Sequence, residues 1–147
     1  MPASDFEKCI RENRLKKEAP DWRVVEKEIA SSHHDLSSAK RSLGSRDFHW
    51  AVSQAYYSCF HSAKALVLAK GFREKSHYCL AIALEELHPE MPAGFAGLLL
   101  SLRRMRESAD YTLEEISKED ASHAIEEAAG FLEYAKKTLK SAAAKRA

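Results

Sequence analysis

The segment from Asp47 to Lys70 constrains the fold more than any other, because it has the pattern of one long helix with two apolar faces. Asp47 suits a helix N-cap, and Gly71 follows where such a helix would end. Steps of three and four residues align one apolar face: Phe48, Val52, Ala55, Cys59, Ala63 and Leu66. The nearly opposite face is aromatic and basic: Trp50, Tyr57, His61 and Lys64. A helix of this kind is covered on two sides, by neighbouring helices, by another subunit or by a ligand.

The segments before Asp47 also carry apolar residues at helical spacing, and no segment shows the sustained alternation typical of a strand. A short amphipathic helix is expected around Phe6 and Ile10. A longer helix is expected from Pro20-Asp21 to Gly44, with apolar positions at Val25, Ile29, Leu36 and Leu43.

Three further helices are expected after Gly71. The first is marked by Leu80, Leu84 and Leu87, and Pro89 and Pro92 separate it from the second. The second has one apolar stripe of Phe95, Leu98, Leu102, Met105 and Ala109. Ser117 and Asp120 resemble a capping box for the third, whose inner stripe is Ala121, Ile125, Ala128, Leu132, Ala135 and Leu139. Long helices joined by short loops predict an all-α, up-and-down helical bundle of four main helices plus short extra helices.

The length of 147 residues suits a single domain over 1–147, and no linker or repeat interrupts it. The formal net charge is only +1, which argues against a basic domain that wraps nucleic acid but leaves room for a local basic patch. The tail at about 136–147 is basic and rich in alanine. Its lysines either complement a helix C-terminus or contact RNA or a partner.

The three cysteines, Cys9, Cys59 and Cys79, are an odd number without CxxC spacing. Cys59 falls on the apolar face of its helix and is interpreted as a small buried thiol. This usage favours a reducing compartment. No apolar run approaches the roughly 18 residues needed to span a membrane, and the N-terminus lacks the apolar core of a signal peptide. The sequence therefore predicts a cytoplasmic protein without a membrane segment.

Several common catalytic and cofactor motifs are absent from the sequence. No HxxxH or HExxH pair occurs among the seven histidines, so a zinc site on a helix is not expected. The patterns GxxxxGK[ST], GxGxxG and GxSxG are also missing. We therefore expect no metal and no cofactor.

Three arginines lie near the end of the fifth expected helix. In a continuous helix Arg103, Arg106 and Asp110 share one face, with Tyr111 next to them. One interpretation is a surface ion pair between Arg106 and Asp110. The other is a nucleotide- or RNA-binding site in which Arg103 and Arg106 hold a phosphate and Tyr111 stacks on a base or acts through its hydroxyl. Arg106 lies at the border of the apolar stripe, so we expect its guanidinium to be partly desolvated.

The chain resembles the HEPN domain family, in particular its stand-alone prokaryotic members, from Phe6 to about Leu139. The features that carry the resemblance are Asp47-Phe48 with Trp50-Ala51, the runs 54–57, 60–61, 63–66 and 71–77, and the Arg106-x-x-Ala109-Asp110-Tyr111 signature. The resemblance implies an all-α bundle and a homodimer with a cleft between the two signature segments. It also implies a minimal nucleotidyltransferase protein as partner in a toxin–antitoxin-like module.

The resemblance also implies a candidate activity, since many HEPN proteins are metal-independent ribonucleases. These enzymes use an arginine that is followed after four to six residues by a histidine. In that mechanism the arginine neutralises a phosphate and the histidine moves a proton. Here Tyr111 stands where the histidine would be, and a phenol with a pKa of about 10 is a poor base at neutral pH. His61 or His77 is an alternative histidine, if either reaches the cleft.

Three functions remain open from the sequence. The first is a dimeric HEPN protein that partners a nucleotidyltransferase and binds nucleotide or RNA through Arg103, Arg106, Asp110 and Tyr111. The second is a ribonuclease toxin with Arg106 and Tyr111, or a displaced histidine, as catalytic residues. The third is a structural dimerisation module with no small-molecule site. In each of them the aromatic face of the 47–70 helix is the candidate interface or cleft.

Overall fold

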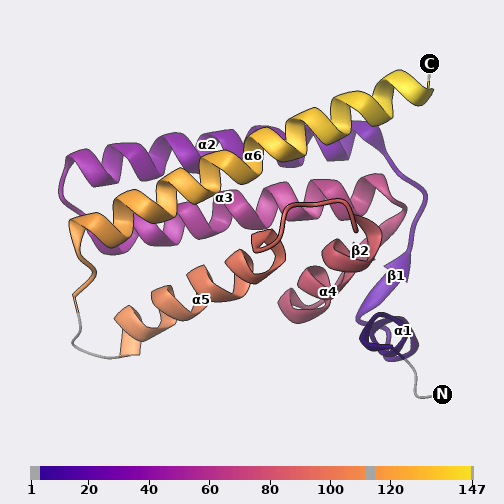
Figure 1. Ribbon diagram of the computed structural model, residues 1–147, viewed down its shortest axis with the longest axis horizontal. Helices are drawn as coiled ribbons and strands as arrows, with labels where there is room; N and C mark the ends of the chain where they lie inside the picture. The colour runs from indigo at the N-terminus through magenta and orange to yellow at the C-terminus, as the bar shows by residue number, and fades with distance from the viewer. Residues whose placement is uncertain (1–3, 112–114, 147) are drawn as a thin grey trace.

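The computed structural model describes residues 4–111 and 115–146, and Figure 1 shows them as a bundle of helices. The described residues form six helices and one short sheet, which confirms the all-α helical bundle. The helices are α1 (Asp5–Arg11), α2 (Trp22–Gly44), α3 (Phe48–Ala69), α4 (His77–Leu87), α5 (Phe95–Tyr111) and α6 (Lys118–Arg146). The sheet pairs β1 (Leu15–Lys17) with β2 (Phe72–Glu74) in antiparallel register.

Helix α3 is the central helix of the bundle. Figure 1 shows α2 and α6 along one side of it and α4 and α5 along the other. The expected apolar face is buried at Val52, Ala55, Cys59, Ala63 and Leu66, and Phe48 is partly buried at its start. The expected inner stripe of α6 is buried as well, from Ala121 to Leu139. The double coverage predicted from two apolar faces is therefore confirmed for most of α3.

Small side chains allow α2 and α3 to pack closely. The hydroxyl of Ser32 on α2 lies 2.9 Å from the hydroxyl of Ser58 and 2.8 Å from that of Ser62, and both of these residues are on α3. Ser32 Oγ also donates to the backbone carbonyl of Ser58 at 2.8 Å. All three serines are buried, so their polar groups are satisfied by one another instead of by water.

The predicted helix ends agree with the observed caps. Asp47 accepts a hydrogen bond from the backbone N–H of Trp50, and Ser117 accepts one from that of Asp120 at 3.0 Å. Gly71 follows α3 with a φ of +88°, a left-handed conformation that favours glycine. Within the described part of the chain, no helix combines the length and the apolar character needed to cross a membrane.

A disulfide between Cys9 and Cys79 joins α1 to α4, and it was not expected from the sequence. Together with the short sheet it attaches the N-terminal segment to the bundle. Cys59 is a free, buried cysteine, as expected. Because two of the three cysteines are paired, the cysteines no longer support a reducing compartment.

Reduction of this disulfide is expected to lower the free energy of unfolding by about 2–4 kcal/mol, because the bond closes a long loop and restricts the unfolded chain. The two cysteines are 70 residues apart in the sequence. Urea denaturation with and without dithiothreitol measures the change. A Cys9→Ser, Cys79→Ser double variant is the control, since reductant should then have no effect. Equal stability of the oxidised and reduced protein would contradict the expectation.

Candidate functional site

The C-terminal half of α5 lies against α3, and this contact fixes Arg106. The Nη1 atom of Arg106 donates a hydrogen bond to the hydroxyl of Tyr57 at 2.7 Å. The guanidinium carbon lies 5.0 Å from the ring centre of Tyr56 and 5.3 Å from that of Tyr57, which are cation–π distances. Arg106 is therefore held between helices by two consecutive tyrosines.

The environment of Arg106 is partly desolvated, as expected from the sequence. Its Nε atom is buried and has no hydrogen-bond partner among the described residues. A guanidinium has five N–H donors in a planar fork that matches phosphate oxygens. An arginine whose position is fixed and whose charge is partly desolvated is suited to bind an anion.

The ion pairs around the arginines differ from the predicted one. Arg103 pairs with Glu107 at 3.0 Å, and Asp110 pairs with His49 of α3 at 2.6 Å. Arg106 and Asp110 are both described and do not pair with each other, so the interpretation as an Arg106–Asp110 ion pair is wrong. The reason is that Arg106 turns toward the tyrosines of α3, whereas Asp110 connects the end of α5 to the start of α3.

A histidine from α4 joins this cluster. The hydroxyl of Ser76 accepts a hydrogen bond from the backbone N–H of Cys79 at 3.0 Å and so caps α4 directly before His77. The Nδ1 atom of His77 is hydrogen-bonded to the hydroxyl of Tyr56, and its ring stacks on Phe60 with 4.7 Å between the ring centres. Phe60 and Tyr56 are one helical turn apart on α3, so one helix face supplies both the stacking ring and the hydrogen-bonding hydroxyl.

The surroundings of His77 favour its neutral form. Burial lowers the pKa of His77 below its ordinary value, and the positive charges of Arg103 and Arg106 lower it further, while Glu107 acts in the opposite direction. Burial also raises the pKa of the Tyr56 phenol, against the influence of the same two arginines. The cluster therefore combines a neutral imidazole, a protonated phenol and two permanent cations.

Four aromatic side chains on the helices that form the cluster are exposed to solvent. The exposed fractions are 57% for Trp50, 41% for Tyr57, 45% for Tyr78 and 87% for Tyr111. Trp50 and Tyr57 belong to α3, Tyr78 follows His77 on α4, and Tyr111 is the last residue of α5. Large exposed aromatic rings near a positively charged group are typical of surfaces that bind a protein partner or stack on bases.

The other two residues of the predicted aromatic-basic face contact α2. His61 lies 2.6 Å from Glu28 and 3.5 Å from Asp35, and Lys64 lies 3.8 Å from both Glu28 and Glu74. The structure therefore brings Tyr57 to Arg106 and directs His61 and Lys64 into an ion-pair network with α2 and β2. Of the two alternative histidines, His77 is the one that lies beside the arginines.

The sequence pattern did not place Tyr56 or Phe60 in the site. Both lie on α3 at a spacing of four residues, but no pattern links them to His77, which belongs to α4. Their role depends on how α4 packs against α3 and α5. In the described ranges there is also no group of three or more side chains that could hold a metal ion.

The helical bundle and this arginine signature define the class of protein. The chain belongs to the HEPN domain family, because the model of the HEPN domain matches residues 25–139, which include all of α3, α4 and α5.

Two relatives from Methanocaldococcus jannaschii are similar over most of their length. The protein named "Putative toxin MJ0605" is 33% identical over 118 residues, which cover 76% of this chain and 86% of the relative. The protein named "Putative toxin MJ0142" is 31% identical over 121 residues, with 80% and 82% covered. A third relative, "UPF0332 protein PH1297" from Pyrococcus horikoshii, is 45% identical over 53 residues, 36% of this chain and 37% of the relative.

Proposed function

We propose that this chain is the HEPN component of a two-component, toxin–antitoxin-like module in the cytoplasm, with a minimal nucleotidyltransferase as its partner. It acts as a homodimer and binds nucleotide or RNA in the cleft between the two copies. The observation that carries the proposal is Arg106, which is fixed against Tyr56 and Tyr57 beside an exposed aromatic surface.

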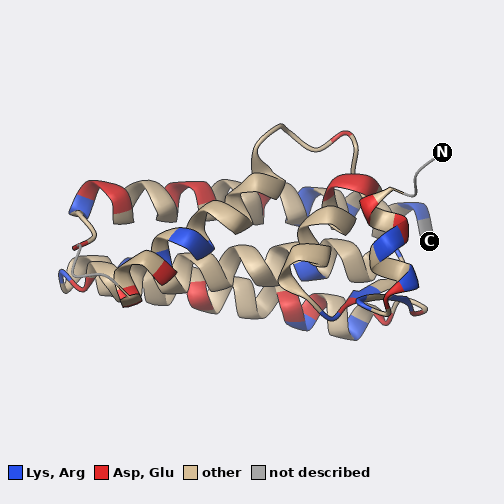
Figure 2. Ribbon diagram, turned by 90° about the horizontal axis from the view of Figure 1, so that it is seen from below, with Lys and Arg blue, Asp and Glu red and all other residues tan. Residues whose placement is uncertain are grey.

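The chemistry of this surface supports nucleotide or RNA as the ligand. Arg106 and Arg103 supply guanidinium groups for a phosphate, and Tyr57, Tyr111 and Trp50 supply exposed rings on which bases stack. The acidic and basic residues are interspersed over the view in Figure 2, and the net charge is +1. A local arginine site is therefore better supported than binding through the charge of the whole domain.

Arg106→Ala is expected to weaken the binding of a short single-stranded RNA about tenfold or more, because a charge-assisted hydrogen bond to phosphate is lost. The slope of log K against log salt should also fall by about 0.7 for one lost phosphate contact. Fluorescence anisotropy with a labelled oligonucleotide measures both effects. Arg104→Ala is the matched control, because Arg104 is an exposed arginine on the same helix. Equal losses in the two variants would contradict a specific site.

The assembly is tested separately from the ligand. Light scattering should give the mass of a dimer, and the protein should co-purify with a minimal nucleotidyltransferase when the two are expressed together. A monomer in solution would exclude a cleft shared by two copies. A protein that binds neither RNA, nor nucleotide, nor a nucleotidyltransferase would leave the dimerisation module as the remaining function.

A metal-independent ribonuclease is the second candidate, and the position of His77 favours it. In the HEPN ribonuclease pattern the histidine follows the arginine after four to six residues, but here a neutral imidazole is supplied by α4 next to Arg103 and Arg106. His77 would take the proton of the attacking 2′-hydroxyl, and an arginine would neutralise the phosphate. Purified protein with RNA and EDTA tests this candidate: cleavage that survives chelation supports it, and intact RNA at high protein concentration counts against it.

A further inference from the structure

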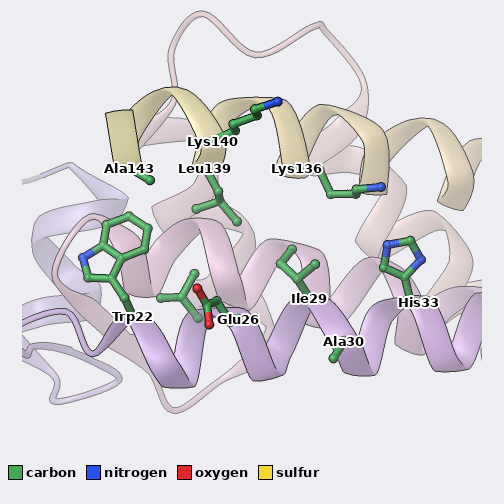
Figure 3. Close-up of a pocket in the computed structure, with 10 residues that line it drawn as sticks. Trp22, Glu26, Ile29, Ala30, His33, Lys136, Leu139, Lys140 and Ala143 are labelled. Carbon is green, nitrogen blue, oxygen red and sulfur yellow. The ribbon is translucent and has the colours of Figure 1, made fainter. Parts of the chain in front are cut away.

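A groove lies between α2 and the C-terminal half of α6 (Figure 3), and its described lining residues do not include those of the arginine cluster. It has a volume of about 470 Å³, which falls within the range of about 300–1,000 Å³ of small-ligand sites. Its floor is apolar and consists of Trp22, Val25, Ile29 and Leu139. The groove stays open because α6 offers only a small side chain, Ala143, opposite the large ring of Trp22.

The groove has a cationic end and an apolar end. Figure 3 shows His33 of α2 facing Lys136 of α6 at one end, and Trp22 facing Ala143 at the other. Lys140 stands on the rim above Leu139. Among the described residues, Lys136 pairs with the exposed Glu133 at 3.4 Å, which is a weak, solvent-screened interaction. Of the described residues that line the groove, Glu26 is the one carboxylate; it is exposed and lies between Trp22 and Ile29 on α2 (Figure 3).

We propose that this groove binds a small organic anion with an apolar body, of the size of a medium-chain carboxylate. The carboxylate lies between Lys136 and His33, and the hydrocarbon chain runs along Ile29 and Leu139 toward Trp22. Trp22 and His33 are eleven residues apart on α2, about 16 Å at 1.5 Å per residue, which suits a chain of about ten carbons. This site is independent of the function proposed for the arginine cluster.

Both the volume and the charge favour this ligand over a protein partner. The groove holds one ligand of moderate size, whereas a stable protein interface buries about 800 Å² on each side. Lys136 and His33 at one end complement an anionic head group, whereas a site for a purely apolar ligand needs no such polar end. A cationic amphiphile would place its head group against Lys136 and is disfavoured.

Titration calorimetry of the full chain with sodium decanoate, below its micelle concentration, is the direct test. Saturable binding of one molecule per chain is expected. The affinity should rise about fourfold for each methylene added from octanoate to decanoate. Decyltrimethylammonium, which has the same chain and a cationic head, should bind at least tenfold more weakly. In a Trp50→Phe background the fluorescence of Trp22 should change with the same affinity.

Matched variants separate this site from general adsorption of a surfactant. Ala143→Leu fills the groove from the α6 side, opposite Trp22, and should weaken decanoate binding about tenfold. Ala144→Leu adds the same side chain at an exposed position of α6 and should leave the affinity unchanged. Lys136→Ala should weaken binding about threefold, and Glu26→Gln should strengthen it.

Four outcomes would overturn the proposal. The first is equal binding of decanoate and decyltrimethylammonium, and the second is equal binding by the Ala143→Leu and Ala144→Leu proteins. The third is a change in the oligomeric state of Ala143→Leu without decanoate binding by the parent protein, which would make the groove a contact between copies of this chain. Tighter binding of a synthetic acidic amphipathic peptide that displaces decanoate would assign the groove to a protein partner and would also overturn it.

Discussion

Phe131→Ala is expected to lower the free energy of unfolding by about 3–5 kcal/mol, because the removed ring leaves a cavity that the bundle fills only in part. Phe131 lies on α6 with an exposed fraction of 0%, and its ring stacks on Phe95 of α5 with 5.1 Å between the ring centres. The free energy of unfolding of a single domain is about 5–15 kcal/mol, so this loss is a large fraction of the total stability. Thermal and urea denaturation measure the change.

The controls for Phe131→Ala come from the same helix and from the contacting ring. Lys137→Ala is exposed on α6 and should change the stability by less than about 0.5 kcal/mol. A double-mutant cycle with Phe95→Ala should give a coupling of about 0.5–1.5 kcal/mol, since the two rings stabilise each other beyond their buried area. A loss below about 1 kcal/mol in Phe131→Ala would show that α6 does not pack as described.

The helices and their order could be predicted from the sequence because the information is local. The steps of three and four residues on α3 and α6, and the caps at Asp47 and Ser117, depend on residues within one or two helical turns. The doubly covered α3 followed from its two faces. The short sheet had no such signal, because strands of three residues are too short to show alternation.

The candidate site could be predicted only in part. The position of Arg106 at the border of an apolar stripe indicated partial desolvation, and this is observed. The partners of Arg106, His61 and Asp110 depend on which helix faces which, and a periodic pattern does not contain that information. The disulfide between Cys9 and Cys79 depends in the same way on the packing of α1 against α4.

Replacing His77 is expected to have the largest effect on any metal-independent cleavage of RNA by this protein. His77→Ala removes the neutral imidazole beside Arg103 and Arg106, and the loss of a general base lowers a rate about 10²–10⁴-fold. Since burial and the two arginines lower the pKa of His77, the rate should stay high at pH values where an ordinary histidine is already protonated. Single-turnover rates with EDTA, from pH 5 to 8, measure both effects.

The position of the histidine is tested by Tyr56→Phe, which removes the hydroxyl that is hydrogen-bonded to Nδ1 and keeps the ring under Arg106. This variant should lower the rate less than His77→Ala and should shift the pH profile of the rate, which a purely structural effect would not do.

His77 should also make the free energy of unfolding depend on pH. The lowered pKa means that the unfolded chain binds the proton more strongly, so the contribution of His77 is complete above about pH 6.5 and is lost as the pH falls below it. His77→Asn should remove this pH dependence. If the free energy of unfolding depended on pH in the same way in His77→Asn, this would contradict the neutral imidazole on which the ribonuclease candidate rests.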